Sequence, residues 1–258
     1  MKFPILVVGF ILSLNFVAAE SWESRELYSE FHGEGAAVGD LNGDGAVDVV
    51  YGPFWFAGPD FSEARRYRPG KAFVGESGYS DSFFVFIQDF DRDGKNDLMS
   101  FGFPGKEAKI HLNPGDDSMW AEFVVADQVA NESPHFVDLI PGGYPEIVCA
   151  RSGSYGYFEA GSDPTKAWKW TSISLPGEAP TPFGHGLGVG DVNGDGRLDV
   201  IEKTHWYEQG GKAGGLWTKH IWAKQSYGGG GAQILVHDLD GDGDNDIVTS
   251  FNAHGHGL

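Results

Sequence analysis

The sequence predicts an all-β protein, a β-propeller built from four-stranded blades, and three observations carry this prediction. An acidic nine-residue loop recurs about every fifty residues, a period typical of propellers and other repeat folds. Short apolar runs rich in valine, isoleucine and phenylalanine flank each loop, and this composition favours strands. The chain also has 39 glycines in 258 residues, which with the aromatic and β-branched runs excludes an array of helical repeats.

The N-terminal segment, residues 1–19, is predicted to be a secretory signal peptide. Lys2 supplies a basic start, an apolar run extends to Val17, and Ala19 suits cleavage before Glu20. The apolar run is short for a membrane span, which needs about 20 residues. We therefore expect an exported protein that is secreted, periplasmic or at the cell surface.

The mature chain, residues 20–258, is expected to form one propeller domain with a strongly acidic surface. Asp and Glu number 37 against 18 Lys and Arg, and the formal net charge is −19. This charge disfavours nucleic acid and anionic membranes as partners and favours bound cations. Cys149 has no second cysteine to pair with, and its apolar neighbours predict a buried side chain. Since no disulfide is possible within the chain, metal ions are the candidate for stabilising the exported fold.

Five loops mark the starts of the repeats. Four are intact: "DLNGDGAVD" from Asp40, "DFDRDGKND" from Asp89, "DVNGDGRLD" from Asp191 and "DLDGDGDND" from Asp238; "DLIPGGYPE" from Asp138 is a degraded copy. A strand-like run precedes each loop and another follows it, as "SFFVFIQ" and "NDLMSFG" do around the second loop. Two more such runs complete the unit, for example "AKIHLNPG" and "MWAEFVVAD", and this gives four strands per repeat.

The loop from Asp191 also has the spacing of an EF-hand calcium loop, with Glu202 at its twelfth position. An EF-hand needs an amphipathic helix on each side, whereas the flanking runs here are predicted strands. The twelfth position in the other intact copies is Tyr51, Ser100 or Thr249. We therefore interpret Glu202 as coincidental and predict that the loop joins two strands.

Each intact loop is predicted to bind one structural Ca²⁺ ion. Calcium prefers six to eight oxygen ligands; positions one, three, five and nine offer side-chain oxygens, position seven offers its carbonyl, and glycine at position six allows the turn. The predicted ligands are Asp40, Asn42, Asp44, Ala46 and Asp48; Asp89, Asp91, Asp93, Lys95 and Asp97; Asp191, Asn193, Asp195, Arg197 and Asp199; and Asp238, Asp240, Asp242, Asp244 and Asp246. In the degraded loop Ile140 and Gly142 replace two ligands, so that loop is expected to bind no ion.

The repeated pattern "GD-x-N-G-D-G-x-x-D-[VI]" and its variants resemble the FG-GAP/VCBS repeat family, the calcium-loop blades of integrin-α-type propellers. The resemblance covers nearly all of the mature chain, and four copies in register make it specific. It implies a propeller of about seven blades. Because the chain offers five starts and about two strands after the last loop, we expect it to be truncated at the C-terminus. The run "SRELYSEF", residues 24–31, is a candidate for the outermost strand of the last blade.

Histidines are the candidate ligand-binding residues. His32 and His185 precede predicted innermost strands, and His254 and His256 follow one; in a propeller these strands line the central channel, and ligands bind at its mouth. The alternative is that these side chains only pack against glycine-rich strands. The chain has no G-x-S-x-G, H-E-x-x-H or paired-cysteine motif, and we assign no catalytic residue.

Two functions remain open. The first is a binding module for an extracellular protein or carbohydrate, acting through loops and aromatic residues such as Trp55, Trp206 and Trp217. The second is a sugar-active enzyme of the lyase or dehydratase type with a His-lined site, since the His-Gly-Leu and acidic-loop pattern slightly resembles the propeller part of fungal aldos-2-ulose dehydratases. Histidines clustered with Glu or Tyr around a pocket favour the enzyme, and scattered histidines favour the binding module.

Overall fold

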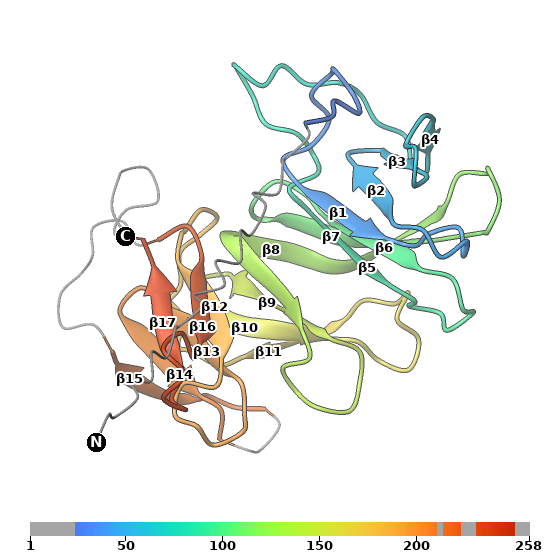
Figure 1. Cartoon of the computed structure of the whole chain (residues 1–258). Coiled ribbons are helices and arrows are strands. Elements are labelled where there is room, and N and C mark those ends of the chain that lie inside the picture. Colours follow the sequence, from blue (N-terminus) through green and yellow to red (C-terminus); the bar gives the residue numbers. More distant parts are fainter. Residues whose placement is uncertain (1–23, 211–213, 223–230, 251–258) are drawn as a thin grey trace, which may run out of the picture.

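The computed structural model describes residues 24–210, 214–222 and 231–250, and within them the regular secondary structure is β-strand (Figure 1). The predicted all-β class is therefore confirmed. The predicted signal peptide, residues 1–19, lies outside the described residues. In the described ranges no helix is long and apolar enough to cross a membrane.

Four sheets of antiparallel strands follow one another along the chain, from the first at the upper right of Figure 1 to the last two at the left. The first sheet orders β1 (Ala36–Gly39), β2 (Asp48–Tyr51), β3 (Phe54–Phe56) and β4 (Ala64–Arg66). The third orders β12 (Leu187–Gly190), β13 (Asp199–Glu202), β14 (His205–Glu208) and β15 (Thr218–Ile221). The last pairs β16 (Ile234–His237) with β17 (Asp246–Thr249). In each sheet the chain runs up and down between neighbouring strands, as the sequence predicts.

The second sheet has seven strands because two predicted repeats share one of them. Its strands in chain order are β5 (Phe84–Gln88), β6 (Asp97–Phe101), β7 (Lys106–Leu112), β8 (Ala121–Val137), β9 (Glu146–Arg151), β10 (Ser154–Glu159) and β11 (Lys169–Ser172). β8 pairs with β7 up to Val129 and with β9 from Ala130 onwards. Asn131, with a φ of 81°, and a register shift before His135 mark the change of partner. The sequence predicts two separate strands here. In the structure the chain continues from one into the other as β8, without a connecting loop.

The first strands of neighbouring repeats lie side by side: β1 is next to β5, β8 is next to β12, and β12 is next to β16. Glycine makes this close approach possible. A Cβ atom at Gly190 would lie 2.4 Å from Cβ of Val236, and one at Gly39 would lie 2.9 Å from Cδ1 of Ile87. A larger residue at Gly190 would push the strands apart, whereas one at Gly39 would first displace the end of the Ile87 side chain. The glycine-rich composition therefore belongs to the strands as well as to the turns.

Three buried clusters fill the spaces within and between the sheets. One lies within the second sheet and includes Met99, Ile110, Cys149 and Trp168; a second joins the second and third sheets through Val148, Tyr157, Leu187 and Val200; a third joins the first and second sheets through Val50, Tyr67, Leu98 and Trp120. The predicted burial of Cys149 is confirmed, and burial raises the pKa of its thiol. Packing between successive sheets therefore supplies much of the core, as expected of a repeat fold.

Two expectations about the edges of the fold are not met as stated. Trp217 is 8% exposed and packs between the second and third sheets. Trp55 is 7% exposed and packs between the first and second sheets, although it also lines a cavity of about 210 Å³. Residues 24–31 do not add a strand to the last repeat. Tyr28 instead packs on Phe54, with ring centroids 4.8 Å apart, so this segment covers the first sheet. In each case burial of a large aromatic side chain against the nearest sheet outweighs the predicted role.

Candidate functional site

The acidic loops lie together at one edge of the sheets, each between the first and second strand of its repeat. Asn96 in the second loop donates a hydrogen bond of 2.7 Å to the backbone carbonyl of Asp40 in the first. Comparable bonds join two further pairs of neighbouring loops, from Asn245 to Asp191 and from Tyr144 to Phe90. Gln209, which follows the third strand of its sheet, donates through its side chain to Leu139 in the degraded loop and through its backbone N–H to Asp199 in the next loop. Every described loop after the first is therefore linked, directly or through Gln209, to the loop that precedes it.

Within each intact loop, acidic side chains accept hydrogen bonds from the backbone amides. Asp40 accepts from the N–H groups of Gly43 and Gly45 at 2.7 and 2.9 Å, and Asp44 accepts from Ala46 at 2.8 Å. The same contacts with the sixth and seventh residues recur in the other three intact loops. The glycine at position six has a φ between 82° and 97° in all four loops, which is the left-handed conformation that favours glycine.

The ninth residue of each loop holds the loop to the sheet. Asp97 accepts from the backbone N–H of Phe90 at 2.8 Å and from that of Asn113 at 2.7 Å, and its side chain is buried. Asp48 and Asp199 make the equivalent pairs of bonds in their repeats. Burial raises the pKa of Asp97 to about 6, although the two amide donors favour the ionised form.

Carboxylate oxygens converge in two of the four intact loops. One ligand atom from each of Asp89, Asp91 and Asp97 lies within 4.8 Å of the other two. Asp238, Asp240 and Asp242 form a second such group. Two oxygens that both contact calcium at about 2.3–2.6 Å cannot lie much farther apart than this, so the groups fit the ion.

The loops from Asp40 and Asp191 carry an amide in place of one acid. Asn42 and Asn193 occupy the third position, where each accepts from the backbone N–H two residues later. Amide oxygens also bind calcium. At the seventh position of two loops, the side chains of Lys95 and Arg197 contact the carboxylates at position five, Asp93 and Asp195. Cationic side chains thus offset part of the negative charge of these loops.

The degraded loop keeps its shape without the acidic cluster. Glu146 replaces the ninth aspartate, and its carboxylate accepts from the backbone N–H groups of Leu139 and Ile140 at 2.9 and 3.1 Å. Burial raises the pKa of Glu146 to about 7. The ninth position therefore serves the fold even in a loop that lacks the third and fifth acids.

A cavity of about 380 Å³ lies between the first and second sheets. It lies beside the end of β6 that is opposite the acidic loop, because β6 leaves the loop at Asp97 and reaches the cavity at Ser100. The wall combines the ring of Phe103 with charged and hydroxyl groups from Arg68, Ser80, Asp81, Ser100, Lys106, Glu107, Lys109 and Glu122. An aromatic surface with convergent polar groups is typical of a small-molecule site.

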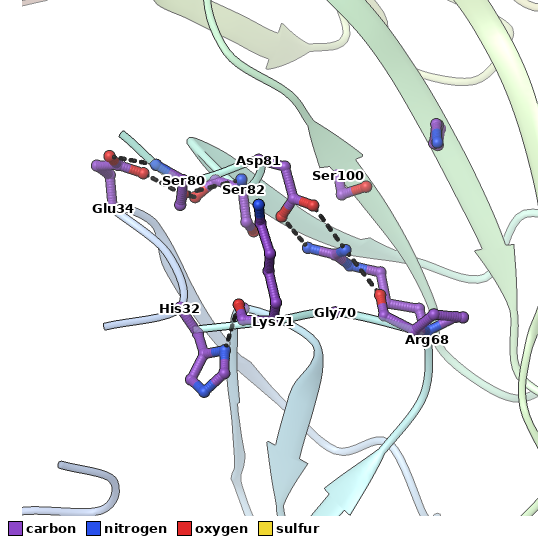
Figure 2. A network of polar contacts seen from close by, with 12 residues as sticks. His32, Glu34, Arg68, Gly70, Lys71, Ser80, Asp81, Ser82 and Ser100 are labelled. Carbon is purple, nitrogen blue, oxygen red and sulfur yellow. Dashed lines mark hydrogen bonds and ion pairs between the residues drawn. The ribbon is translucent and has the colours of Figure 1, made fainter. Parts of the chain in front are cut away.

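Arg68 and Asp81 form the central ion pair of this cavity (Figure 2). The two terminal nitrogens of Arg68 lie 2.9 and 3.4 Å from the two carboxylate oxygens, in a fork-like arrangement. Burial disfavours the charge of Arg68, but the hydrogen bond and charge of Asp81 outweigh it, so the arginine pKa is raised. Nε of Arg68 is buried and has no hydrogen-bond partner in the described part of the chain.

His111 lies fully buried at the back of the same cavity. Its Nε2 is 2.8 Å from Oγ of Ser100, and its Nδ1 is 3.9 Å from a carboxylate oxygen of Glu122. Burial, together with the positive charges of Arg68 and Lys109, lowers the histidine pKa to about 3. His111 is therefore neutral at physiological pH and serves as a hydrogen-bonding group.

The two candidate histidines that the structure describes, His32 and His185, lie in different surroundings. His32 is 3% exposed and packs among the rings of Tyr28, Tyr51 and Phe54, with its Nδ1 2.8 Å from the carbonyl oxygen of Lys71. This contact is visible at the lower left of Figure 2. The alternative of packing therefore describes His32, whereas His254 and His256 lie outside the described residues.

His185 lines a second cavity, of about 400 Å³, between the second and third sheets. Its Nε2 is 2.8 Å from a carboxylate oxygen of Glu132. The same cavity is lined by Glu202, whose Oε1 lies 2.7 Å from Nδ1 of His205. Glu202, which the sequence analysis set aside as coincidental, therefore faces a cavity. Trp206, on the neighbouring strand, stacks on His220 with ring centroids 4.3 Å apart.

Sequence reasoning missed the first cavity because its residues come from unrelated segments. Arg68 follows β4, Asp81 precedes β5, and His111 lies in β7. No spacing in the sequence links these positions. One signal was present: Ser100 and Glu202 both occupy the twelfth position of their loops, and each lines a cavity.

Comparison with known proteins finds a structure of similar fold but identifies no family. No protein-family model matches the chain, and no curated protein matches it. The structure is similar to that of an Agrocybe aegerita lectin described as recognising non-reducing terminal N-acetylglucosamine, with a TM-score of 0.53 and 17% identity over 83% of this chain and 60% of that one. The V. cholerae biofilm matrix protein Bap1 (19% identity, 64% of this chain, 27% of that one) and a Photorhabdus luminescens Tc holotoxin pore (16%, 83% and 10%) each give a TM-score of 0.39. The chain thus spans less than two thirds of each of these proteins.

Proposed function

We propose that this protein is a calcium-stabilised β-propeller that binds carbohydrate in the cavity between its first and second sheets. The observation that carries the proposal is that cavity itself. It joins an aromatic ring, Phe103, to a fork-like ion pair, in which buried Arg68 meets the more exposed Asp81, and to the hydroxyl of Ser100. Sugars present both apolar C–H faces and many hydroxyl groups, so they need both kinds of contact.

The propeller part of the proposal rests on how the repeats adjoin. The first strands of neighbouring repeats are adjacent, glycines such as Gly190 allow close approach, and the loops of successive repeats are hydrogen-bonded at one edge. Radial blades that meet at their innermost strands have this arrangement. Membership of the FG-GAP/VCBS family remains a proposal based on the four loop motifs in register.

Calcium is proposed as the ion of the four intact loops. Two of them gather three carboxylates within 4.8 Å, and all four present oxygen atoms, which suit a hard cation. The predicted side-chain ligands also hold the loop backbone, so an ion bound there would stabilise the folded state selectively. When bound, calcium would reduce the repulsion among the crowded acids of each loop.

Carbohydrate is proposed ahead of other ligands on the grounds of charge. The first cavity places three cations, Arg68, Lys106 and Lys109, beside three anions, Asp81, Glu107 and Glu122. Balanced charges suit a neutral, hydroxyl-rich ligand better than a phosphate or a nucleic acid, and the net charge of −19 repels polyanions. The recognition of N-acetylglucosamine attributed to the similarly folded Agrocybe aegerita lectin supports the same class of ligand.

A binding role is preferred to the sugar-active enzyme. The described candidate histidines are scattered, since His32 is packed among aromatic rings and only His185 of these two faces a cavity. Export through the signal peptide, residues 1–19, is proposed with the binding role, since a glycan ligand would then be met outside the cell.

The test is a glycan array probed with the calcium-loaded protein and two matched variants. Lys109→Gln breaks a Lys–Glu pair at the cavity, with Glu122 at 2.8 Å, whereas Lys169→Gln breaks a pair with Glu159 that lines neither cavity. We expect the wild type and Lys169→Gln to bind the same glycans and Lys109→Gln to bind them at least about ten-fold more weakly. Equal binding by all three proteins would contradict the assignment of the cavity. Turnover of a keto-sugar panel would favour the enzyme.

A further inference from the structure

The two cavities adjoin each other through a pair of phenylalanine rings. Phe103 lines the first cavity and Phe183 lines the second. Their ring centroids lie 5.4 Å apart in an edge-to-face contact, although the residues are 80 positions apart in the sequence (183 − 103). A ligand that extends out of one cavity past this ring pair therefore reaches the other.

The aromatic contact continues beyond this pair. The ring of Tyr79 lies 5.4 Å from that of Phe103 and 5.9 Å from that of Phe83. We call Tyr79, Phe83, Phe103 and Phe183 the aromatic row. Tyr79 is 65% exposed and Phe183 is 49% exposed, so the row presents ring surface to solvent at both ends. Exposed aromatic side chains in contact with one another on a soluble protein indicate a binding surface.

The second cavity offers the same kind of polar lining as the first. Glu178, Glu202 and Lys203 face it together with His185. Glu178 is held by Lys219 at 2.8 Å, and Glu202 is 6% exposed and held by His205 and Thr204. These acceptors are fixed before any ligand arrives, which lowers the entropic cost of binding.

We propose that the two cavities and the aromatic row form one extended site for a polymeric neutral glycan. This inference rests on the proposed carbohydrate function and adds the class of ligand: a chain of several sugar rings, bound along its length, in place of a single terminal sugar. The two polar cavities hold hydroxyl groups of separate sugar residues, and the row supports the rings between them. A polyanionic glycan is disfavoured, because acids outnumber cations around the second cavity and over the whole chain.

The test is the dependence of affinity on chain length. Chito-oligosaccharides and cello-oligosaccharides, each from monomer to hexamer, are titrated by calorimetry into the calcium-loaded protein. Linked contacts at two subsites raise affinity without any new contact at either one, so we expect binding to the hexamer of at least one series to be roughly ten-fold or more tighter than binding to its monomer. Tyr79→Ala, at a ring that lines neither cavity, is expected to remove this gain while monomer affinity stays unchanged. Phe183→Ala, which also alters the lining of the second cavity, is expected to remove the gain as well. Leu216→Ala, at a residue that is 59% exposed and lines neither cavity, is the control.

The possible failures are distinguishable. Equal affinity at every chain length, or an equal loss for monomer and hexamer in Tyr79→Ala, would overturn the extended site and leave the single-cavity proposal standing. Absence of binding to any neutral glycan, in both oligosaccharide series and on the array, would overturn the extended site together with the proposed function.

Discussion

The two edges of the sheets differ in how closely their residues and hydrogen bonds repeat from one unit to the next. At the loop edge, the same contacts recur in each intact copy: the first acid accepts from the sixth residue, and the fifth acid accepts from the seventh. At the cavity edge, equivalent positions hold unlike residues. The twelfth position, for example, is Ser100 in one repeat and Glu202 in another.

Residues at the loop edge meet a structural requirement that is common to every repeat, whereas residues at the cavity edge serve a single site. Each loop must close a turn and hold its neighbour, so its residues are fixed by local geometry. The cavity edge has no such common requirement, because the residues there can vary as long as the strands beneath them remain paired. We therefore expect changes at the loop edge to alter stability and changes at the cavity edge to alter binding.

Removal of calcium, which acts at the loop edge, should have the largest effect on stability. Four sites with dissociation constants of ~10⁻⁴ M, at a ten-fold excess of free calcium, together contribute about 6 kcal/mol to the free energy of unfolding. For a domain of this size, loss of that energy lowers the melting temperature by roughly 10–20 °C. Differential scanning calorimetry with and without EDTA measures the shift, and an unchanged melting temperature would exclude a stabilising role for metal.

A single loop substitution should have a smaller and local effect. Asp91→Ala removes one of the three clustered carboxylates of the second loop, and we expect the loss of one bound calcium. The stability in calcium should fall by about 2 kcal/mol, about 1.5 from the lost ion and the rest from the hydrogen bond that Asp91 accepts from the backbone N–H of Asp93. Asp138→Ala, at the exposed first position of the degraded loop, is the matched control and should change neither value. Calcium titration calorimetry counts the sites. A full complement of sites in Asp91→Ala would contradict the ligand assignment.

The smallest effect expected is a pH dependence of stability that arises from Glu146 in the degraded loop. Burial raises the pKa of Glu146 from 4.5 to about 7, so the folded protein binds an extra proton between these values. Stability from this group is complete below about pH 4.5 and is lost as the pH rises through about 7, by about 1.5 kcal/mol after allowance for solvent screening.

The matched variant for this prediction is Glu146→Gln. A glutamine oxygen can still accept the two backbone hydrogen bonds, from Leu139 and Ile140, without titrating. Urea unfolding at pH 5 and pH 8, at constant calcium, should therefore show a smaller decline for this variant than for the wild type. Parallel declines would mean that other groups cause the pH dependence.

The part of the structure that repeats was predictable from the sequence, and the part that does not repeat was not. Loop positions such as Asp97 and Gly94 follow a fixed spacing, and the strands around them follow from their apolar runs. The sharing of β8 by two repeats escaped prediction because Asn131 and Pro134, which are typical of a turn, stand here inside a strand that continues without a connecting loop. Arg68 and His111 escaped it because tertiary packing alone brings them to one cavity.

The most direct test of the account compares one variant from each edge in the same two assays. Asp91→Ala and Lys109→Gln are measured for calcium-dependent melting and for binding to the glycan that the wild type selects on the array, at a temperature where both are folded. The account predicts that Asp91→Ala loses calcium-dependent stability and keeps glycan affinity, whereas Lys109→Gln keeps its melting behaviour and loses affinity. Loss of both properties in both variants, or of neither in either, would contradict the separation of the two edges.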